Sequence, residues 1–219
     1  MVALDIGHTL AQHGSTSARG KGEFEFNQRI VRQLFARLDK SRVAAPFIIN
    51  PEGGKFALID RAKVAAREGA ELFLSIHHDS ANDKYLQWWD PDGNGSKQQY
   101  SDKFRGYGVF VSKKNRQPDR SLKFALALGG AMKARGFVFT PHHSERIQGE
   151  NRPILDESSG VYQYEDLIVL KNAPMPAALL ECGVIINRAE ELELKKPETQ
   201  ARIADAAASA IEAFFKPGS

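Results

Sequence analysis

Short apolar runs alternate along the chain with segments in which apolar residues recur every three or four positions. Several of the runs are apolar at every position, as strands covered by helices on both faces must be. The runs predict six strands, at residues 2–6, 47–50, 71–76, 107–111, 167–170 and 177–181. Strands that alternate with helices are typical of an α/β protein, and this is the predicted fold class.

Four segments carry the spacing of an amphipathic helix, with apolar side chains along one stripe. In the first segment Ile30, Leu34 and Leu38 recur every four residues, and Gly69 follows the second, where a helix end favours glycine. The predicted helices cover residues 23–39, 57–68, 121–135 and 198–215. A chain of 219 residues suits one α/β domain, so we expect a single domain over residues 1–219.

Two polar segments, residues 83–105 and 137–166, interrupt this alternation. The first contains two adjacent tryptophans, and the second contains two adjacent histidines. Long irregular segments inside a compact domain usually serve function. We therefore expect both to form loops at the edge of an active site.

Charge and cysteine content narrow the functional classes. The 30 Lys and Arg residues against 27 Asp and Glu give a formal net charge of +3. This charge suits an anionic polymer as partner but is too weak to indicate nucleic acid. No run of about 18 apolar residues occurs, so the sequence predicts no membrane span. Cys182 is the single cysteine, which excludes an internal disulfide.

The predicted first strand starts directly after Met1, without a charged or apolar leader before it. Two interpretations fit: a protein that has no secretory leader, or a catalytic domain separated from one. A core strand at residue 2 favours the second interpretation.

Three ionisable residues lie at the carboxyl ends of predicted strands, where α/β sheets place their ligands. His8 follows the first strand, His77 follows the third and Glu181 ends the last. Glu23 opens the first helix, which returns from the loop after His8. We expect these four residues to converge on one edge of the sheet.

Two imidazoles and one carboxylate form a common ligand set of catalytic zinc, which keeps a fourth position for water. We predict Zn²⁺ held by His8, Glu23 and His77. Zinc lowers the pKa of a water ligand to roughly 7, and a carboxylate that is not a ligand is then needed to move protons. Glu181 is the candidate, because burial at the end of an apolar strand raises the pKa of a carboxyl group.

Each residue also has an ordinary interpretation. A histidine after a strand often caps it, Glu23 suits the positive end of a helix dipole, and Glu181 suits a buried ion pair. Composition and spacing alone do not name the reaction.

Four blocks of the sequence carry a further signal. They are Asp5-Ile6-Gly7-His8, then Glu23 with Asn27, then Ser75-Ile76-His77-His78-Asp79, and last Pro176-Ala177-Ala178-Leu179-Leu180-Glu181-Cys182-Gly183 continued by Asn187 and Glu190. In this order they resemble the motifs of the zinc-dependent N-acetylmuramoyl-L-alanine amidases. That family includes the catalytic domains of bacterial division amidases and of many phage endolysins.

The resemblance implies zinc ligands at His8, Glu23 and His77 and a catalytic glutamate at Glu181. It implies hydrolysis of the amide between N-acetylmuramic acid and L-alanine, with peptidoglycan as partner. It also implies a twisted six-stranded, mixed, mostly parallel sheet with helices on both faces. We expect a periplasmic or extracellular monomer, with an endolysin made in the cytoplasm as the alternative, and leave an activator protein open.

Two other functions fit the same residues. One is a zinc peptidase or deacylase that acts on another amide, which the motif match disfavours. The other is an inactive peptidoglycan-binding module, which an intact set of ligands disfavours.

Several neighbours of the four residues are weaker candidates. Glu25 competes with Glu23, but two residues apart on a helix means roughly opposite faces, and the spacing to Asn27 favours Glu23. His78 points away from His77 if the strand continues, which favours a structural or solvent role. Asp79 returns to the face of His77, where it serves either as a hydrogen-bond partner behind the ligands or as a turn cap.

The remaining candidates lie in the two loops and beside Glu181. Trp88 and Trp89 form either a lid or platform for sugar or peptide, or a small hydrophobic cluster beneath the loop, which we favour slightly. His142 and His143 lack ligand spacing, so we interpret them as groove residues rather than extra ligands. Cys182 alternates with Glu181 and is expected in the core.

Overall fold

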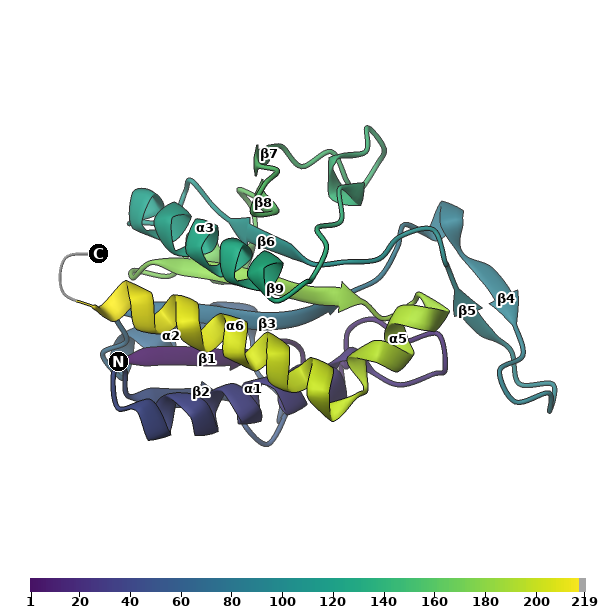
Figure 1. Cartoon of the computed structure of the whole chain (residues 1–219), viewed down its shortest axis with the longest axis horizontal. Coiled ribbons are helices and arrows are strands. Elements are labelled where there is room, and N and C mark those ends of the chain that lie inside the picture. The colour runs from purple at the N-terminus through teal and green to yellow at the C-terminus, as the bar shows by residue number, and fades with distance from the viewer. Residues whose placement is uncertain (217–219) are drawn as a thin grey trace.

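One seven-stranded sheet forms the centre of the computed structural model, which describes residues 1–216 (Figure 1). The strand order is β2 (Pro46–Ile49), β1 (Val2–Ile6), β3 (Leu72–Asp79), β9 (Ala177–Val184), β6 (Gly108–Val111), β8 (Val161–Gln163) and β7 (Ile154–Asp156). The first four strands run parallel, as do β6 and β8, whereas β9–β6 and β8–β7 are antiparallel. The mixed, mostly parallel sheet is confirmed, with seven strands instead of six.

The strand predicted at residues 167–170 is wrong. Residues Ile168–Lys171 form the short helix α4, and the amides of Leu170 and Lys171 both donate to the carbonyl of Leu167. Val169 and Leu170 are buried against the sheet, so the segment is apolar because it covers the sheet. A four-residue apolar run does not distinguish a strand from a buried helical turn.

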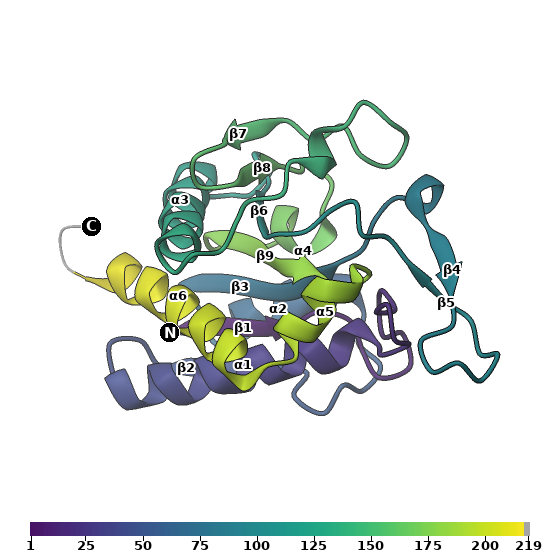
Figure 2. The ribbon, with the colours of Figure 1, turned by 45° about the vertical axis from the view of Figure 1, so that its right-hand side comes forward.

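The two polar segments contain strands that the pattern did not reveal. Strands β7 and β8 lie within residues 137–166, and β4 (Gln87–Trp89) pairs with β5 (Gln98–Tyr100) within residues 83–105. The β4–β5 hairpin extends away from the body of the molecule (Figure 2). Each of these strands has three residues, too few for an alternation to stand out in the sequence.

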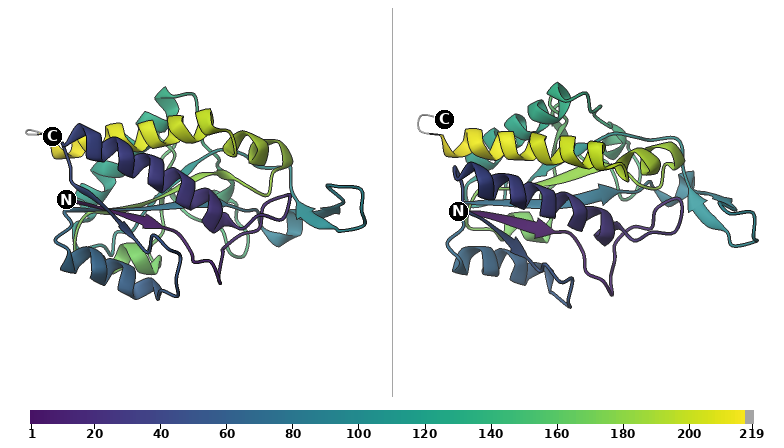
Figure 3. Two further views of the ribbon diagram at one scale, coloured as in Figure 1. Left: turned by 90° about the horizontal axis from the view of Figure 1, so that it is seen from below. Right: turned by 60° about the horizontal axis from the view of Figure 1, so that its bottom comes forward.

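Helices cover both faces of the sheet (Figure 3). One face packs against α1 (Glu23–Ser41), α3 (Pro118–Ala134) and α6 (Pro197–Phe215), and the other against α2 (Leu58–Arg67) and α4. All four predicted helices are confirmed within a few residues. The structure adds α5 (Arg188–Leu194) and two 3₁₀ turns, η1 (Asp83–Tyr85) and η2 (His142–Ser144). Among the described residues, no helix is both long and apolar enough to cross a membrane.

The central strands β3 and β9 bring two of the predicted site residues to one face. His77 lies directly opposite Glu181 in the parallel register, so both side chains point to the α2 and α4 side of the sheet. Beyond this pair the register shifts, and Asp79 lies opposite Val184. Such a β-bulge next to a site changes the direction of the side chains that follow it.

Candidate active site

The structure brings His8, Glu23 and His77 together at the carboxyl end of the sheet. His8 Nε2 lies 3.0 Å from Glu23 Oε2, and His77 Nδ1 lies 3.0 Å from Glu23 Oε1. The two imidazole rings meet edge to face at 4.8 Å between centroids. We name these three residues the first ligand group. They come from the ends of β1 and β3 and the start of α1, as the sequence predicted.

Glu23 is held by several donors besides the two histidines. Its carboxylate accepts hydrogen bonds from the amides of Ser15 and His78 and from the side chain of Asn27. Burial alone would raise the pKa of Glu23, but hydrogen bonds to His77 and His8 and their charge hold that pKa well below its usual value. Glu23 is therefore an ionised carboxylate facing two imidazoles.

Glu25 lies on the solvent side of α1 and contributes nothing to this group, because its side chain is exposed whereas Glu23 is buried. The structure thus places Glu23, and not Glu25, beside the two histidines, as the spacing to Asn27 predicted.

Asn27 links the helix to both neighbouring strands. Its amide nitrogen donates to Gly7 O and to Glu23, and its oxygen lies 2.8 Å from His78 Nδ1. Burial lowers the pKa of His78 to about 3, so the ring is neutral and Nδ1–H donates to Asn27. His78 thus faces away from His77 and has a structural position, as expected.

A buried arginine that the sequence analysis overlooked fixes the backbone beneath His8. Arg61 on α2 contacts Asp5 Oδ1 at 2.6 Å and donates to the carbonyls of Ile6 and His8, also at 2.6 Å. Ser75 donates to the other Asp5 oxygen. We name these contacts of Arg61 the clamp. It holds His8 at φ 69°, a left-handed conformation that costs a non-glycine residue energy. In the sequence, an arginine on the same stripe of the helix as Ala62 and Ala65 could have indicated this buried charge.

Two glycines leave room for the rings of the first ligand group. A Cβ on Gly7 would lie 2.4 Å from the His77 ring. A Cβ on Gly14, whose φ is +78°, would lie 2.4 Å from both Glu23 Oε2 and the His8 ring. Only glycine fits at these two positions of close approach.

Glu181 lies beside this group in a different environment. Its Oε2 atom is buried and has no hydrogen-bond partner among the described residues. Burial, reinforced by the charges of Asp79 and Glu23, raises the pKa of Glu181 well above its usual value. The side chain lines a cavity of about 170 Å³ together with His143, Phe110 and Tyr164. A carboxyl group of this kind is suited to proton transfer.

Asp79 Oδ1 accepts a hydrogen bond from the amide of Ser80, as a turn cap does, and the described residues show no hydrogen bond between Asp79 and His77. The Asp79 Oδ2 atom faces His142 and His143, which come from the segment after α3. We name Asp79, His142 and His143 the second ligand group. Burial would lower the pKa of His143, but the carboxylates of Asp79 and Glu150 outweigh it and raise that pKa to about 10.

The two tryptophans lie next to each other on β4 but have different environments. Trp88 is 64% exposed, whereas Trp89 donates to Ala18 O, and the guanidinium groups of Arg19 and Arg188 lie 5.0 and 5.1 Å from its ring centroid. Trp89 also meets the ring of Tyr100 edge to face at 5.9 Å between centroids, and neither tryptophan belongs to the two core clusters. The choice between a platform for substrate and a small cluster beneath the loop therefore stays a prediction.

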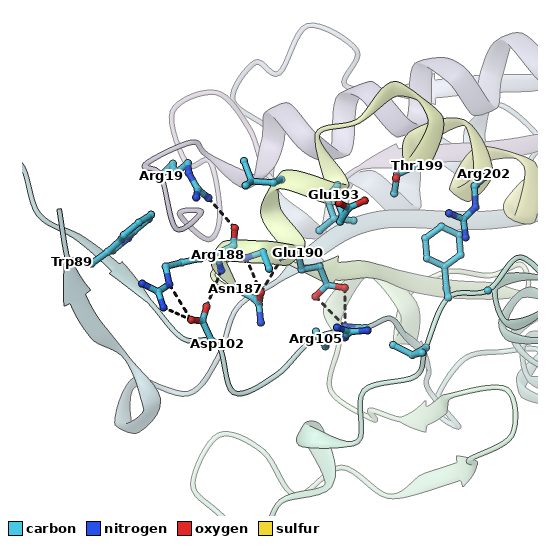
Figure 4. A pocket seen from close by; sticks show the side chains of 17 residues that line it. Arg19, Trp89, Asp102, Arg105, Asn187, Arg188, Glu190, Glu193, Thr199 and Arg202 are labelled. Atoms are coloured by element: carbon cyan, nitrogen blue, oxygen red, sulfur yellow. Dashed lines mark hydrogen bonds and ion pairs between the residues drawn. The ribbon is translucent and has the colours of Figure 1, made fainter. Parts of the chain in front are cut away.

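Trp89 stands at one end of the largest described cavity, about 840 Å³, with Arg202 toward the other end (Figure 4). Asp102 bonds Arg188 in its wall, and Glu190 accepts from the amide of Gly106. None of the four predicted site residues lines this cavity. Size alone therefore does not identify the reaction centre, and the unpartnered Glu181 points to the smaller cavity.

Cys182 is buried in the core on the opposite side of β9 from Glu181, as predicted. Burial raises the pKa of its thiol well above the usual value, which makes it unreactive.

The first ligand group fits a divalent transition metal. Two imidazole nitrogens and an ionised carboxylate converge, and zinc bonds of about 2.0–2.1 Å place neighbouring tetrahedral ligand atoms about 3.3 Å apart. The two 3.0 Å separations approach this value. Asn27 orients the carboxylate from behind, as groups around a metal site commonly do.

Comparison with known proteins agrees along the whole chain. The profile of the family described as N-acetylmuramoyl-L-alanine amidase matches residues 2–213. The N-acetylmuramoyl-L-alanine amidase AmiA of Salmonella typhimurium is 26% identical over 226 residues, which cover 98% of this chain and 76% of AmiA.

Two solved structures share the fold. The amidase Ami1 of Mycobacterium smegmatis has a TM-score of 0.75 at 20% identity, covering 98% of this chain and 95% of Ami1. The CwlD amidase of Clostridioides difficile, solved in complex with the GerS lipoprotein, has a TM-score of 0.70 at 19% identity, covering 97% and 96%. Because the family profile spans nearly all of the sequence, the chain belongs to the N-acetylmuramoyl-L-alanine amidase family.

Proposed function

We propose that this chain hydrolyses the amide bond between the lactyl group of N-acetylmuramic acid and L-alanine in peptidoglycan. The observation that carries the proposal is an intact site in a member of the amidase family: three convergent ligand side chains beside an unpartnered, buried carboxyl group. The formal charge of +3 suits an anionic polymer as substrate.

The first ligand group is the proposed site of Zn²⁺, through His8 Nε2, His77 Nδ1 and a Glu23 oxygen. A zinc ion bound there would supply a Lewis acid that polarises the amide carbonyl and acidifies the attacking water. The buried contacts of Asn27 and Arg61 hold these ligands in place before substrate arrives.

Glu181 is the proposed general base and acid. Its carboxylate accepts a proton from the attacking water as the oxygen bonds to the carbonyl carbon. Glu181 then returns that proton to the alanine nitrogen while the C–N bond breaks. The second proton of the water remains on the new carboxyl group and then dissociates, so the products are a lactyl carboxylate and a stem peptide with a free amino terminus. The raised pKa of Glu181 suits both halves of this transfer.

Glu181→Gln tests this assignment, because glutamine keeps the shape but does not accept the proton. We expect the purified variant to retain zinc by elemental analysis and to release N-terminal alanine from peptidoglycan at least about 10³-fold more slowly than the unmodified chain. Turnover at the unmodified rate would remove Glu181 from the mechanism.

Glu23→Gln and Glu25→Gln form a matched pair on one helix, one buried between the histidines and one exposed. Glu23→Gln should lose the zinc of the first ligand group together with activity, whereas Glu25→Gln should keep both. Equal loss in the two variants would contradict the ligand role of Glu23.

The products distinguish this function from the alternatives. New N-terminal alanine without new reducing ends indicates the amidase, whereas a different new amino terminus would indicate a peptidase. Peptidoglycan bound without cleavage, with and without chelator, would indicate a binding module.

The substrate locates the proposed activity in the periplasm or outside the cell, at the cell wall. Because CwlD was solved with the GerS lipoprotein, a protein activator is a further proposal for this chain. Size-exclusion chromatography with and without a candidate activator measures both this association and the expected monomer.

A further inference from the structure

The second ligand group has the same donor types as the first but lies in another part of the fold. Asp79 Oδ2 lies 2.7 Å from His143 Nε2 and 3.1 Å from His142 Nε2. All three candidate ligand atoms lie within 4.8 Å of one another. One carboxylate oxygen and two Nε2 atoms therefore converge on one point.

The other nitrogen of each ring already has an oxygen partner. His143 Nδ1 lies 2.9 Å from Glu150 Oε2, and His142 Nδ1 lies 2.8 Å from Thr140 Oγ1. An Nδ1 proton on each ring satisfies these contacts and leaves both Nε2 lone pairs directed at Asp79. Metal-bound histidines commonly show this arrangement, in which the nitrogen away from the metal donates to a carboxylate or hydroxyl oxygen.

His142 provides an independent observation. The residue is 2% exposed, and its Nε2 atom has no hydrogen-bond partner among the described residues. It lies at ion-pair distance from Asp79 but out of line for a hydrogen bond. A protonated His143 would donate to both Asp79 and Glu150, so both of its nitrogens would have partners. His142 Nε2 would still have none. A cation at the point of convergence would satisfy both rings and the carboxylate.

Aromatic side chains enclose the two rings. Phe104 stacks on His142 at 4.7 Å between centroids, and the edges of Phe110 and Tyr162 meet the His143 ring at 4.9 and 5.5 Å. The side chains of His143 and Asp79 are only 12% and 14% exposed. Ligands in such a shell are shielded from water, which strengthens their interaction with a cation.

We propose that Asp79, His142 and His143 bind a second divalent cation, of the class that includes zinc. Two imidazoles and one carboxylate suit a borderline metal better than calcium or magnesium, which prefer oxygen ligands. The proposal goes beyond the amidase function and does not depend on it, because it concerns different residues.

The position of the group indicates a structural role for this cation. Thr140, both histidines and Glu150 all belong to the segment between α3 and β7, whereas Asp79 ends β3. A bound cation would fasten that segment to the central strand. His143 and Glu181 line the same cavity, so the cation would also fix part of the wall of the cavity that contains Glu181.

Counting bound zinc in three variants tests the proposal. Each protein is saturated with Zn²⁺, dialysed and analysed by elemental mass spectrometry. The unmodified chain should retain two equivalents, and His77→Ala should retain one, held by the second group. The double variant His142→Gln and His143→Gln should also retain one, held by the first group. His13→Gln, which removes an exposed histidine, should retain two.

His77→Ala keeps the test decisive even if the buried double variant fails to fold, because every residue of the second group remains. In this variant, Zn²⁺ should raise the melting temperature and slow amide exchange over residues 140–150. Retention of no zinc by folded His77→Ala, as judged by circular dichroism, would overturn the proposal. Loss of activity in Glu181→Gln leaves these counts unchanged, so the two proposals fail separately.

Discussion

The two ligand groups have the same composition, two histidines and one carboxylate, but they are assembled in different ways. The first is built on the ends of β1 and β3 and the start of α1, with Glu23 fixed by backbone amides and Asn27. The second joins the end of β3 to an irregular segment whose histidines are neighbours in sequence.

This difference teaches where rigidity comes from. The first group is held by regular elements packed on both faces of a sheet, which suits groups that must keep a reactive geometry. The second is held by side-chain contacts within one loop, which suits a group that fixes the loop itself. Variants that weaken one support and not the other therefore distinguish the two.

Arg61→Met should have the largest effect. It removes the guanidinium beneath the first group and leaves Asp5 buried without its charge partner. We expect a loss of about 3–5 kcal/mol in the free energy of unfolding. Zinc affinity of the first group should fall about 10- to 100-fold. Urea unfolding and zinc titration measure the two effects.

Arg67→Met is the matched control, because Arg67 lies on the same helix with a side chain that is 72% exposed. It should change stability by no more than about 0.5 kcal/mol. Similar stabilities for both variants would mean that the clamp beneath His8 is unimportant.

Gly14→Ala should affect the first group through a steric collision, in addition to the backbone strain of a positive φ. Its Cβ would collide with Glu23 and His8, so we expect a fall in activity of about 10²-fold, typical of a site displaced by an ångström. Gly93→Ala has a similar positive φ but open space around it, and should leave activity unchanged. Rates of alanine release compare the two variants. An unchanged rate in Gly14→Ala would show that the close approach of Gly14 to Glu23 and His8 does not matter for activity.

Asn27→Ala and Thr140→Val should each weaken zinc binding at one ligand group, by less than the changes above. Asn27 supports Glu23 of the first group, and Thr140 supports His142 of the second. Each variant should weaken zinc binding about tenfold at its own group and leave the other group unchanged. Calorimetric titration resolves the two equivalents. A change at both groups from either variant would show that they are coupled rather than independent.

The smallest effect is expected from modification of Cys182, because its thiol is buried in the core on the face of β9 opposite Glu181. The raised pKa and burial of the thiol predict no alkylation by iodoacetamide in the native protein and full alkylation in urea. Rapid labelling of the native protein, followed by mass spectrometry, would place the thiol on the exposed side instead.

The sequence by itself determined the α/β class, the four long helices and the four residues of the proposed reaction centre. These follow from regularity: apolar runs mark the central strands, and parallel strands carry the residues at their carboxyl ends to one edge. Glu23 was separable from Glu25 because a helix turns about 100° per residue.

Only the tertiary structure decided the rest. Asp79 and His143 are 64 residues apart, and no periodicity relates a strand end to a loop. Residues 168–171 form a helix because their apolar side chains cover the sheet, a role that a four-residue run shares with a strand. Arg61 is buried because Asp5 and two carbonyls from the first strand and its loop receive its charge, contacts that exist only once α2 packs on β1. Local pattern specifies regular elements, whereas the partners of buried charges depend on how those elements meet.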